Sequence, residues 1–240
     1  LSSDGNTVAI GANQNDSNGS DSGHVRVYNF TNGTTWTQLG SDIEGEDGND
    51  QSGYSVSLSS DGKTVAVGAI ENDGNGNSSG QVRIYNYNET NWTQLGADIN
   101  GEAANDESGY SVSLSSDGTT VAIGARGNDD NGSNSGHVRI YNYNETAWSQ
   151  LGSDIDGVED NGYAGSSVFL SSDGTNIVFQ AQSGLVKAYD LVKLFNSSPV
   201  ASNVSGATVK NTDAMIHLVA SDLDFDDLTY SIVSEPSSGT

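Results

Sequence analysis

The chain has 240 residues, of which 8 are Lys or Arg and 32 are Asp or Glu, giving a net charge of −24 at pH 7. Such a charge repels nucleic acid and anionic membrane surfaces, so we expect neither as a partner. There is no cysteine, which excludes disulfides and Cys-based zinc sites. No apolar run approaches the roughly 18 residues of a membrane span, so no membrane insertion is expected within this sequence.

An internal repeat organises most of the chain. The string Leu-Ser-Ser-Asp-Gly begins at Leu1, Leu58, Leu114 and Leu170, at spacings of 57, 56 and 56 residues. Residues 54–99 and 110–155 align without gaps and are identical at 35 of 46 positions. Repeats of this length become stable by stacking, because one repeat cannot bury its own apolar face.

Each repeat has the pattern of four β-strands. In the second repeat, residues 54–58 alternate apolar and polar, which is typical of a half-buried strand. Asp61-Gly62 predicts a tight turn, and the apolar run 64–69 predicts a strand buried on both faces. After a loop rich in Asn, Asp and Gly, residues 81–87 and 92–96 predict the third and fourth strands. No 3.6-residue period with caps occurs, so no helix is expected.

Four antiparallel strands in about 56 residues predict a β-propeller blade. The expected fold class is all-β: a partial β-propeller of four-stranded antiparallel blades, followed by a truncated β-sandwich segment. The predicted blades are residues 1–53 (partial), 54–109, 110–165 and 166–195 (degenerate), with a linker at 196–203. The first blade lacks most of its first strand, so we expect an arc that belongs to a longer protein.

The motifs of these blades resemble a known family. Ser52-Gly53-Tyr54, Asp61-Gly62 and the run Gly80 to Tyr85 are similar to the FG-GAP blade of integrin-α-like β-propellers, and the pattern returns at 109–141 and more loosely at 165–189. The resemblance implies an extracellular propeller for adhesion or ligand binding. The hairpin that carries a calcium loop in that family has one carboxylate here, so we do not expect calcium at it. The same hairpin is also similar to the blades of TolB-type propellers.

The C-terminal segment departs from the repeat. Pro199-Val200 and the acidic run that ends in Leu228-Thr229-Tyr230 resemble the cadherin-like modules of large bacterial surface proteins, and residues 204–240 are predicted to be a truncated module of this kind. Hard oxygen ligands at alternating positions suit Ca²⁺. The predicted calcium ligands are Asp222, Asp224, Asp226 and Asp227. The alternative is a solvated acidic loop without an ion.

The Asn/Asp/Gly loops of the blades are weaker candidates for calcium or for a ligand-binding face, because propeller loops often carry function. The residues concerned are Asp73, Asn75 and Asn77 in one blade and Asp129 and Asn131 in the next. The alternative is a polar connection stabilised by Asx turns.

Two residue types recur at fixed positions. Arg26, Arg83, Arg139 and Lys187 share one place in the third strand. A buried cation needs a partner, so we expect each to pair with a carboxylate of its own or a neighbouring blade, the alternative being ligand binding. Trp36, Trp92 and Trp148 share the start of the fourth strand. We expect these rings to pack between blades; the alternative is an exposed row that stacks on sugars.

Signals for catalysis are weak. The acidic loops at 46–50, 102–107 and 159–160 recur at equivalent places, whereas catalytic sites are single and asymmetric, so no enzyme is expected. His24 and His137 are equivalent, but the blade between them has Gln81 at that position, and no cluster of histidine with carboxylates is predicted.

These features predict a non-enzymatic adhesion or ligand-binding protein, located outside the cell or at the cell surface. Its propeller loops present a binding surface to a protein or glycan ligand, and calcium stiffens the cadherin-like spacer. Two alternatives stay open: a non-catalytic propeller domain of a large secreted hydrolase, and a purely structural surface spacer.

Overall fold

The computed structural model describes residues 1–31, 33–195, 200–201 and 220–221. It divides into two compact units, residues 1–191 and 192–240, which we describe separately. Nearly all of the predicted linker and cadherin-like module lies outside the described residues. The predicted calcium ligands lie outside them as well: Asp222, Asp224, Asp226 and Asp227. The module and its calcium site therefore stay predictions.

Little of the second unit is described. Helix α1 (Leu191–Phe195) spans its boundary, and strand β18 (Val200–Ala201) pairs antiparallel with strand β19 (Ala220–Ser221). The helix corrects the expectation that the chain has none. With 5 residues, it is too short to show a 3.6-residue period, so the sequence pattern could not reveal it.

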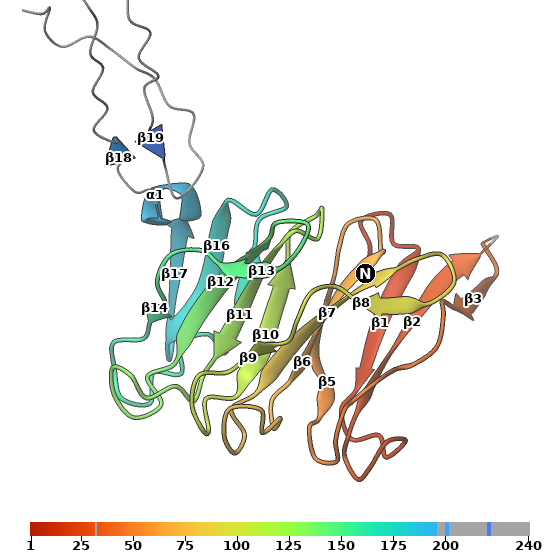
Figure 1. The fold of residues 1–240 in the computed structure, drawn as a ribbon, viewed down its shortest axis with the longest axis horizontal. Coiled ribbons are helices and arrows are strands. Elements are labelled where there is room, and N and C mark those ends of the chain that lie inside the picture. Colours follow the sequence, from red (N-terminus) through yellow and green to blue (C-terminus); the bar gives the residue numbers. More distant parts are fainter. Residues whose placement is uncertain (32, 196–199, 202–219, 222–240) are drawn as a thin grey trace, which may run out of the picture. The chain divides into compact units, whose positions relative to one another are not determined.

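The first unit consists of four antiparallel sheets that follow one another in chain order, here called blades 1 to 4 (Figure 1). Blade 1 contains β1 (Thr7–Ala12), β2 (His24–Thr31), β3 (Thr35–Gln38) and β4 (Ile43–Glu44). Blade 2 contains β5 (Ser52–Leu58), β6 (Thr64–Ala69), β7 (Gln81–Tyr87), β8 (Trp92–Gln94) and β9 (Ile99–Asn100). Blade 3 contains β10 (Ser108–Leu114), β11 (Thr120–Ala125), β12 (His137–Tyr143), β13 (Trp148–Gln150) and β14 (Ile155–Asp156). Blade 4 contains β15 (Val168–Leu170), β16 (Asn176–Gln182) and β17 (Leu185–Asp190).

This arrangement confirms the all-β prediction and the arc of propeller blades, and no sheet among the described residues closes on itself. Blade 1 starts at the strand that corresponds to β6 of blade 2, as the shortened first repeat predicted. Blade 4 has three strands, in line with its degenerate sequence. Each later blade lies against the preceding one through its first strand: β5 contacts β1, β10 contacts β5 and β6, and β15 contacts β10 and β11.

The sequence missed a short strand at the end of each of the first three blades. In blade 2, β9 pairs with β7 beyond the end of β8, so that Val82 lies opposite Ile99 while Tyr87 lies opposite Trp92. The strands β4 and β14 take the same place in blades 1 and 3. Two residues are too few to display the alternation that identifies a strand, so only the pairing with a neighbour reveals them.

Apolar side chains fill the spaces between blades. Val25 and Val27 of blade 1 pack in one cluster with Val65 and Val67 of blade 2. The other face of β6 contributes Ala66 to a second cluster, which joins blade 2 to blade 3. All six residues of β6 are buried, as the continuous apolar run predicted. Stacking therefore provides the core that no single sheet has.

The tryptophans confirm the packing prediction where a preceding blade is present. The indole N–H of Trp92 donates to the Leu39 carbonyl of blade 1 at 2.8 Å, and that of Trp148 donates to the Leu95 carbonyl of blade 2 at 2.7 Å. Trp92 is only 8% exposed, whereas Trp36 of blade 1 is 48% exposed. Each indole thus ties its blade to the one before it, and the exposed fraction depends on whether that neighbour covers the ring.

A pair of tyrosines marks the contact between the first strands of blades 2 and 3. The rings of Tyr54 and Tyr110 lie 5.1 Å apart, and the Arg126 guanidinium lies 3.7 Å above the Tyr110 ring. Arg126 Nε in turn donates to Glu107 Oε2 at 2.6 Å. Hydrogen bonding to Tyr110, together with burial, raises the pKa of the Tyr54 phenol to about 12.

This shift predicts a pH dependence of stability. Because the folded protein holds the Tyr54 proton more tightly than the unfolded chain, its contribution is fully present below about pH 10 and is lost as pH rises through about 12. Subtracting the alkaline ultraviolet titration of Tyr54→Phe from that of the wild type isolates this phenol. A component that titrates near 10, as in a free tyrosine, contradicts the prediction.

Candidate functional site

Two loops enclose a polar cleft at the boundary of blades 1 and 2. One is the acidic loop between β4 and β5, and the other is the Asn/Asp/Gly loop between β6 and β7. The cleft has a volume of about 630 Å³. Its lining residues are Glu46, Asp47, Gly48, Asn49, Asp50, Glu71, Asn72, Asp73, Gly74, Asn77, Ser78, Gln81, Asp98 and Asn100.

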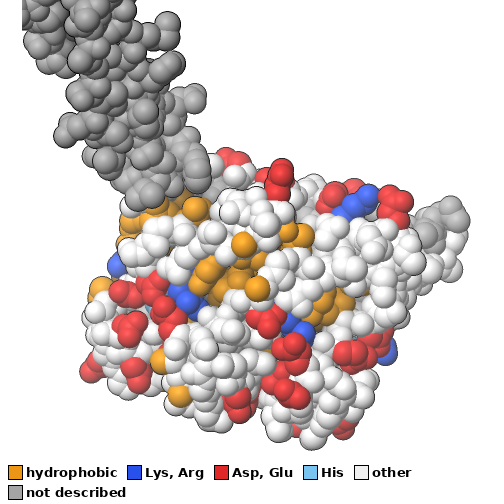
Figure 2. Space-filling view, in the orientation of Figure 1, with side chains coloured by type: hydrophobic (Ala, Val, Ile, Leu, Met, Phe, Trp, Pro, Cys, Tyr) orange, Lys and Arg blue, Asp and Glu red, His pale blue; other side chains and the backbone are white. Residues whose placement is uncertain are grey.

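The cleft is strongly acidic. Six carboxylates line it and no Lys or Arg does. On the face drawn in Figure 2, Asp and Glu side chains gather in groups around a few basic side chains. The electrostatic potential in the cleft favours cations and positively charged ligand groups, because charges of one sign in a concave site reinforce one another.

Three of the five loop residues predicted as weak calcium ligands make side-chain hydrogen bonds to backbone groups of the loops. Asp73 Oδ1 accepts from the Ser78 amide at 2.8 Å, and Asp129 Oδ1 accepts from the Asn134 amide at 2.6 Å. The Asn75 side chain donates to the Gly101 carbonyl at 2.8 Å. These bonds span five residues or reach another loop, so they order the polar loops without being Asx turns. The Asx turns of these loops are made by Asn72 and Asn128, whose side chains accept from the amides two residues on. Calcium binding by Asp73, Asn75, Asn77, Asp129 and Asn131 stays a prediction.

The recurring arginines of the third strands confirm the prediction of carboxylate partners. Arg26 Nη2 lies 2.7 Å from Asp42 Oδ2 within blade 1. Arg83 Nη1 lies 3.3 Å from Glu46 Oε1, and Arg139 Nη1 lies 3.5 Å from Glu102 Oε1. In these last two pairs the carboxylate belongs to the loop that leaves the preceding blade, so the ion pairs join blades. Lys187 of blade 4 forms no such ion pair with a described residue.

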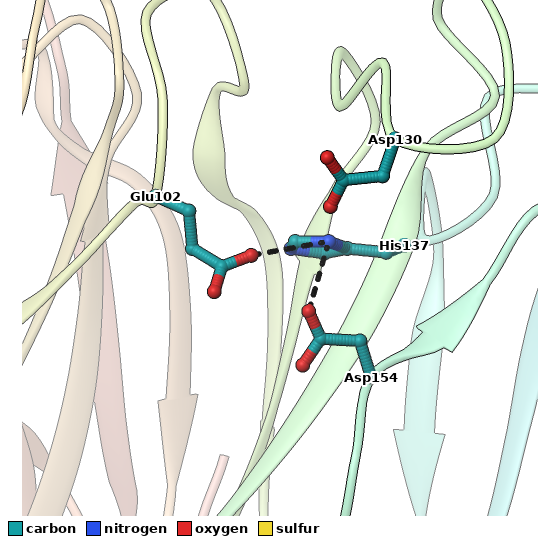
Figure 3. Close-up of side chains that lie close together, drawn as sticks. All are labelled: Glu102, Asp130, His137 and Asp154. Atoms are coloured by element: carbon teal, nitrogen blue, oxygen red, sulfur yellow. Dashed lines mark ion pairs between the residues drawn. The ribbon is translucent and has the colours of Figure 1, made fainter.

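A second site, at the boundary of blades 2 and 3, corrects the expectation that the histidines join no cluster. Glu102, Asp130, His137 and Asp154 each place one ligand atom within 4.8 Å of the others (Figure 3). His137 on β12 is fully buried, and its Nδ1 lies 3.6 Å from Asp154 Oδ2 and 3.8 Å from Glu102 Oε2. The four residues come from separate loops and strands, so their meeting depends on how the blades dock.

Neither ring nitrogen of His137 has a hydrogen-bond partner among the described residues. Both carboxylate distances exceed the range of a hydrogen bond. Burial lowers the pKa of the His137 imidazole, and the nearby Arg139 charge adds to this effect, which favours a neutral ring. Burial also raises the pKa of Glu102, against the opposing effect of Arg139.

The positions equivalent to His137 in blades 1 and 2 have different surroundings. In blade 1, His24 Nδ1 lies 3.7 Å from Asp42 Oδ2, but that oxygen already accepts two hydrogen bonds from Arg26. Hydrogen bonding to Arg26 lowers the pKa of Asp42. In blade 2 the histidine is replaced by Gln81, whose amide donates to Asn100 Oδ1 at 3.2 Å. Among the described residues, blade 3 alone thus combines the histidine with three carboxylates.

Comparison with known proteins identifies the repeats. The family model described as FG-GAP repeat matches residues 43–85 and 100–141, which run from β4 to β7 and from β9 to β12. These two stretches are similar to FG-GAP repeats. Both matched stretches cross a blade boundary, so the FG-GAP unit contains the acidic loops and the glutamates that pair with Arg83 and Arg139. No curated protein matches the chain.

Among solved structures, one match supports a propeller-like fold for this chain. A putative 6-phosphogluconolactonase from Bacteroides uniformis matches with a TM-score of 0.55 and 13% identity, over 79% of this chain and 49% of that one. The hydrazine synthase of Kuenenia stuttgartiensis matches with a TM-score of 0.49 and 16% identity, over 80% of this chain and 45% of that one. The chain thus spans about half the length of each. At this identity the first match shows a propeller-like fold and nothing about activity.

Within the part of the chain that the structure describes, no helix is long and apolar enough to cross a bilayer.

Proposed function

We propose that this chain is a non-enzymatic binding region of an extracellular or cell-surface protein, and that the acidic cleft between blades 1 and 2 binds its ligand. FG-GAP repeats support the extracellular setting. The observation that carries the binding role is the cleft itself, a concave surface with six carboxylates and no basic side chain.

The chemistry of the cleft favours a protein ligand with a basic segment. Lysine and arginine side chains supply the positive charges that the carboxylates lack, and such complementarity accelerates encounter and selects the partner. The cleft has no aromatic residue in its lining, so it offers no ring on which a sugar can stack. A basic peptide therefore fits the cleft better than a glycan does.

Several observations fit a binding region better than an enzyme. The acidic residues of the cleft recur in the next blade, where Glu102, Asp106 and Asp129 take the places of Glu46, Asp50 and Asp73. Their partners are structural, since Asp50 accepts from the Asn72 side chain and Glu46 pairs with Arg83.

A proposed calcium site at Asp222, Asp224, Asp226 and Asp227 accompanies this function, and calorimetry with Asp224→Ala tests it separately.

The cleft is tested with the double variant Asp47→Ala, Glu71→Gly. These substitutions install the residues that blade 3 has at the same positions, Ala103 and Gly127, so the fold has a precedent for both. We expect the variant to bind arrayed lysine- and arginine-containing peptides at least about tenfold more weakly than the wild type, and raised salt to weaken wild-type binding.

The matched control removes two exposed carboxylates outside the cleft, Glu145→Gly and Glu159→Ala, and changes the net charge equally. It is expected to leave peptide binding within about twofold of the wild type. Equal weakening in both variants means that the overall negative field attracts the peptide, and the cleft proposal fails. Binding of neutral glycans that raised salt leaves unchanged contradicts the basic partner.

A further inference from the structure

The buried imidazole of His137 has no hydrogen-bond partner among the described residues, although three carboxylates surround it. Its Nδ1 faces Glu102, Asp130 and Asp154 (Figure 3). The ring is fully buried and neither nitrogen is hydrogen bonded to a described residue. An orphaned buried polar group costs about 1–3 kcal/mol, and an ion among these carboxylates removes that cost at Nδ1.

We propose that Glu102, Asp130, His137 and Asp154 bind one divalent transition-metal ion, which links blade 2 to blade 3. Glu102 comes from the loop that leaves blade 2, whereas the other three residues belong to blade 3. One imidazole nitrogen with carboxylate oxygens is a donor set that suits zinc and manganese, whereas calcium and magnesium take oxygen ligands alone.

The spacing of the donor atoms fits an ion between them. Two ligand atoms of a tetrahedral zinc ion lie about 3.3 Å apart, because each is about 2.0 Å from the metal. His137 Nδ1 lies 3.6 Å from Asp154 Oδ2 and 3.8 Å from Glu102 Oε2. These distances are too long for hydrogen bonds and slightly longer than a coordinated pair, so small side-chain movements bring the atoms onto one ion.

Neighbouring groups hold two of the three carboxylates by the oxygen that is not paired with the imidazole. Gln150 Nε2 donates to Asp154 Oδ1 at 2.6 Å, which leaves Oδ2 free toward His137. Arg139 lies beside Glu102 Oε1, which leaves Oε2 free in the same way. Partners of this kind orient the ligands of metal sites and are a large part of their affinity.

The charges also balance with a divalent ion. Three carboxylates bring three negative charges, and Arg139 offsets one of them. The remaining two are the charge that a divalent cation neutralises. An entry path exists as well, because Glu102 and Asp130 are exposed at the surface while His137 lies beneath them.

Blade 2 shows what the same framework looks like without the site. It keeps the Arg83–Glu46 pair and the hydrogen bond from Gln94 to Asp98, but it has Gln81 in place of the histidine and Gly74 in place of Asp130. The framework is therefore shared between blades, and the ligand set is particular to blade 3.

The test is metal titration of the whole chain and of the double variant Asp130→Gly, His137→Gln. This variant copies the residues of blade 2, where Gly74 makes the same backbone hydrogen bond to Asn72 that Asp130 makes to Asn128. Circular dichroism and the thermal midpoint of the metal-free proteins verify that it folds. The probes are Zn²⁺ alone and Co²⁺ alone, the second for its visible absorption.

We expect the wild type to bind one Zn²⁺ tightly, with a raised thermal midpoint, and to give with Co²⁺ the d–d bands of a site that contains an imidazole. The variant should bind at least about 100-fold more weakly, since loss of an outer partner alone costs roughly 10–100-fold. Equal zinc affinity of a folded variant, or displacement of Zn²⁺ by equimolar Ca²⁺, overturns the proposal. So does the absence of zinc binding by the wild type.

Discussion

Replacing Trp92 with alanine is expected to lower the free energy of unfolding by about 3–5 kcal/mol, the usual cost of removing a large buried aromatic ring. The ring is 8% exposed and packs in the apolar cluster that joins blades 1 and 2. Its N–H donates to the Leu39 carbonyl of blade 1, so the variant also removes the indole donor of that partly buried carbonyl. Chemical denaturation followed by circular dichroism measures the change.

Trp36 is the matched control, because it occupies the same position of blade 1 with no preceding blade over it among the described residues. It is 48% exposed, and its ring is tilted by 41° against that of Phe30, with ring centres 5.1 Å apart. We expect Trp36→Ala to cost less than about 1 kcal/mol. Similar losses for Trp36→Ala and Trp92→Ala contradict the view that the recurring tryptophans act between blades.

The second large effect is expected from Gly68→Ala in β6. A Cβ at this position lies 2.2 Å from the Gly109 carbonyl oxygen of blade 3, too close for any real contact. Backbone cannot move aside as a side chain can, so the blades must separate. We expect a loss of about 3 kcal/mol in unfolding free energy, the upper end of ordinary overpacking, although alanine is otherwise the better residue in a strand.

Gly48→Ala is the control for this prediction. Its Cβ lies 3.3 Å from the nearest atom, the Ser20 carbonyl oxygen, and the change is expected to stay within about 0.5 kcal/mol of the wild type. A stable Gly68→Ala protein contradicts the close docking of blades 2 and 3. The position is glycine in the first three blades, Gly11, Gly68 and Gly124, and Gln180 in blade 4, where the described residues place no following blade.

Much of the architecture follows from the sequence. The repeat spacing predicts blades, and the continuous apolar run predicts that β6 is buried on both faces. The alternation in β5 does not predict its burial, because Tyr54 is exposed and residues 55–58 are all half-buried. The recurring Arg83 and Trp92 predict their roles, since a cation or an indole repeated inside a sheet needs a carboxylate or an apolar partner. The burial of β6 and the repeated position of a residue type both depend on the order of side chains along one strand, so the sequence shows them directly.

The short strands β4, β9 and β14, the helix α1 and the two sites are not predictable in this way. Two-residue strands show no period, and a five-residue helix shows none either. The recurrence of histidine at His24 and His137 was the available signal for the second site, together with Asp130 where blade 2 has Gly74. It pointed to no cluster, because two whole strands, β10 and β11, and their connecting loops separate Glu102 from His137.

By itself, the sequence determined the longer strands, the burial of β6 on both faces and the repetition that stacks the blades, because the order of side chains along a strand is a local property. Only the tertiary structure decided which carboxylates surround His137 and which loops enclose the acidic cleft. Both depend on the docking of one blade against the next, where backbone approaches backbone at Gly68 and Gly109. Contacts between loops of different blades leave no periodic trace in the chain, so they appear only when the blades are assembled.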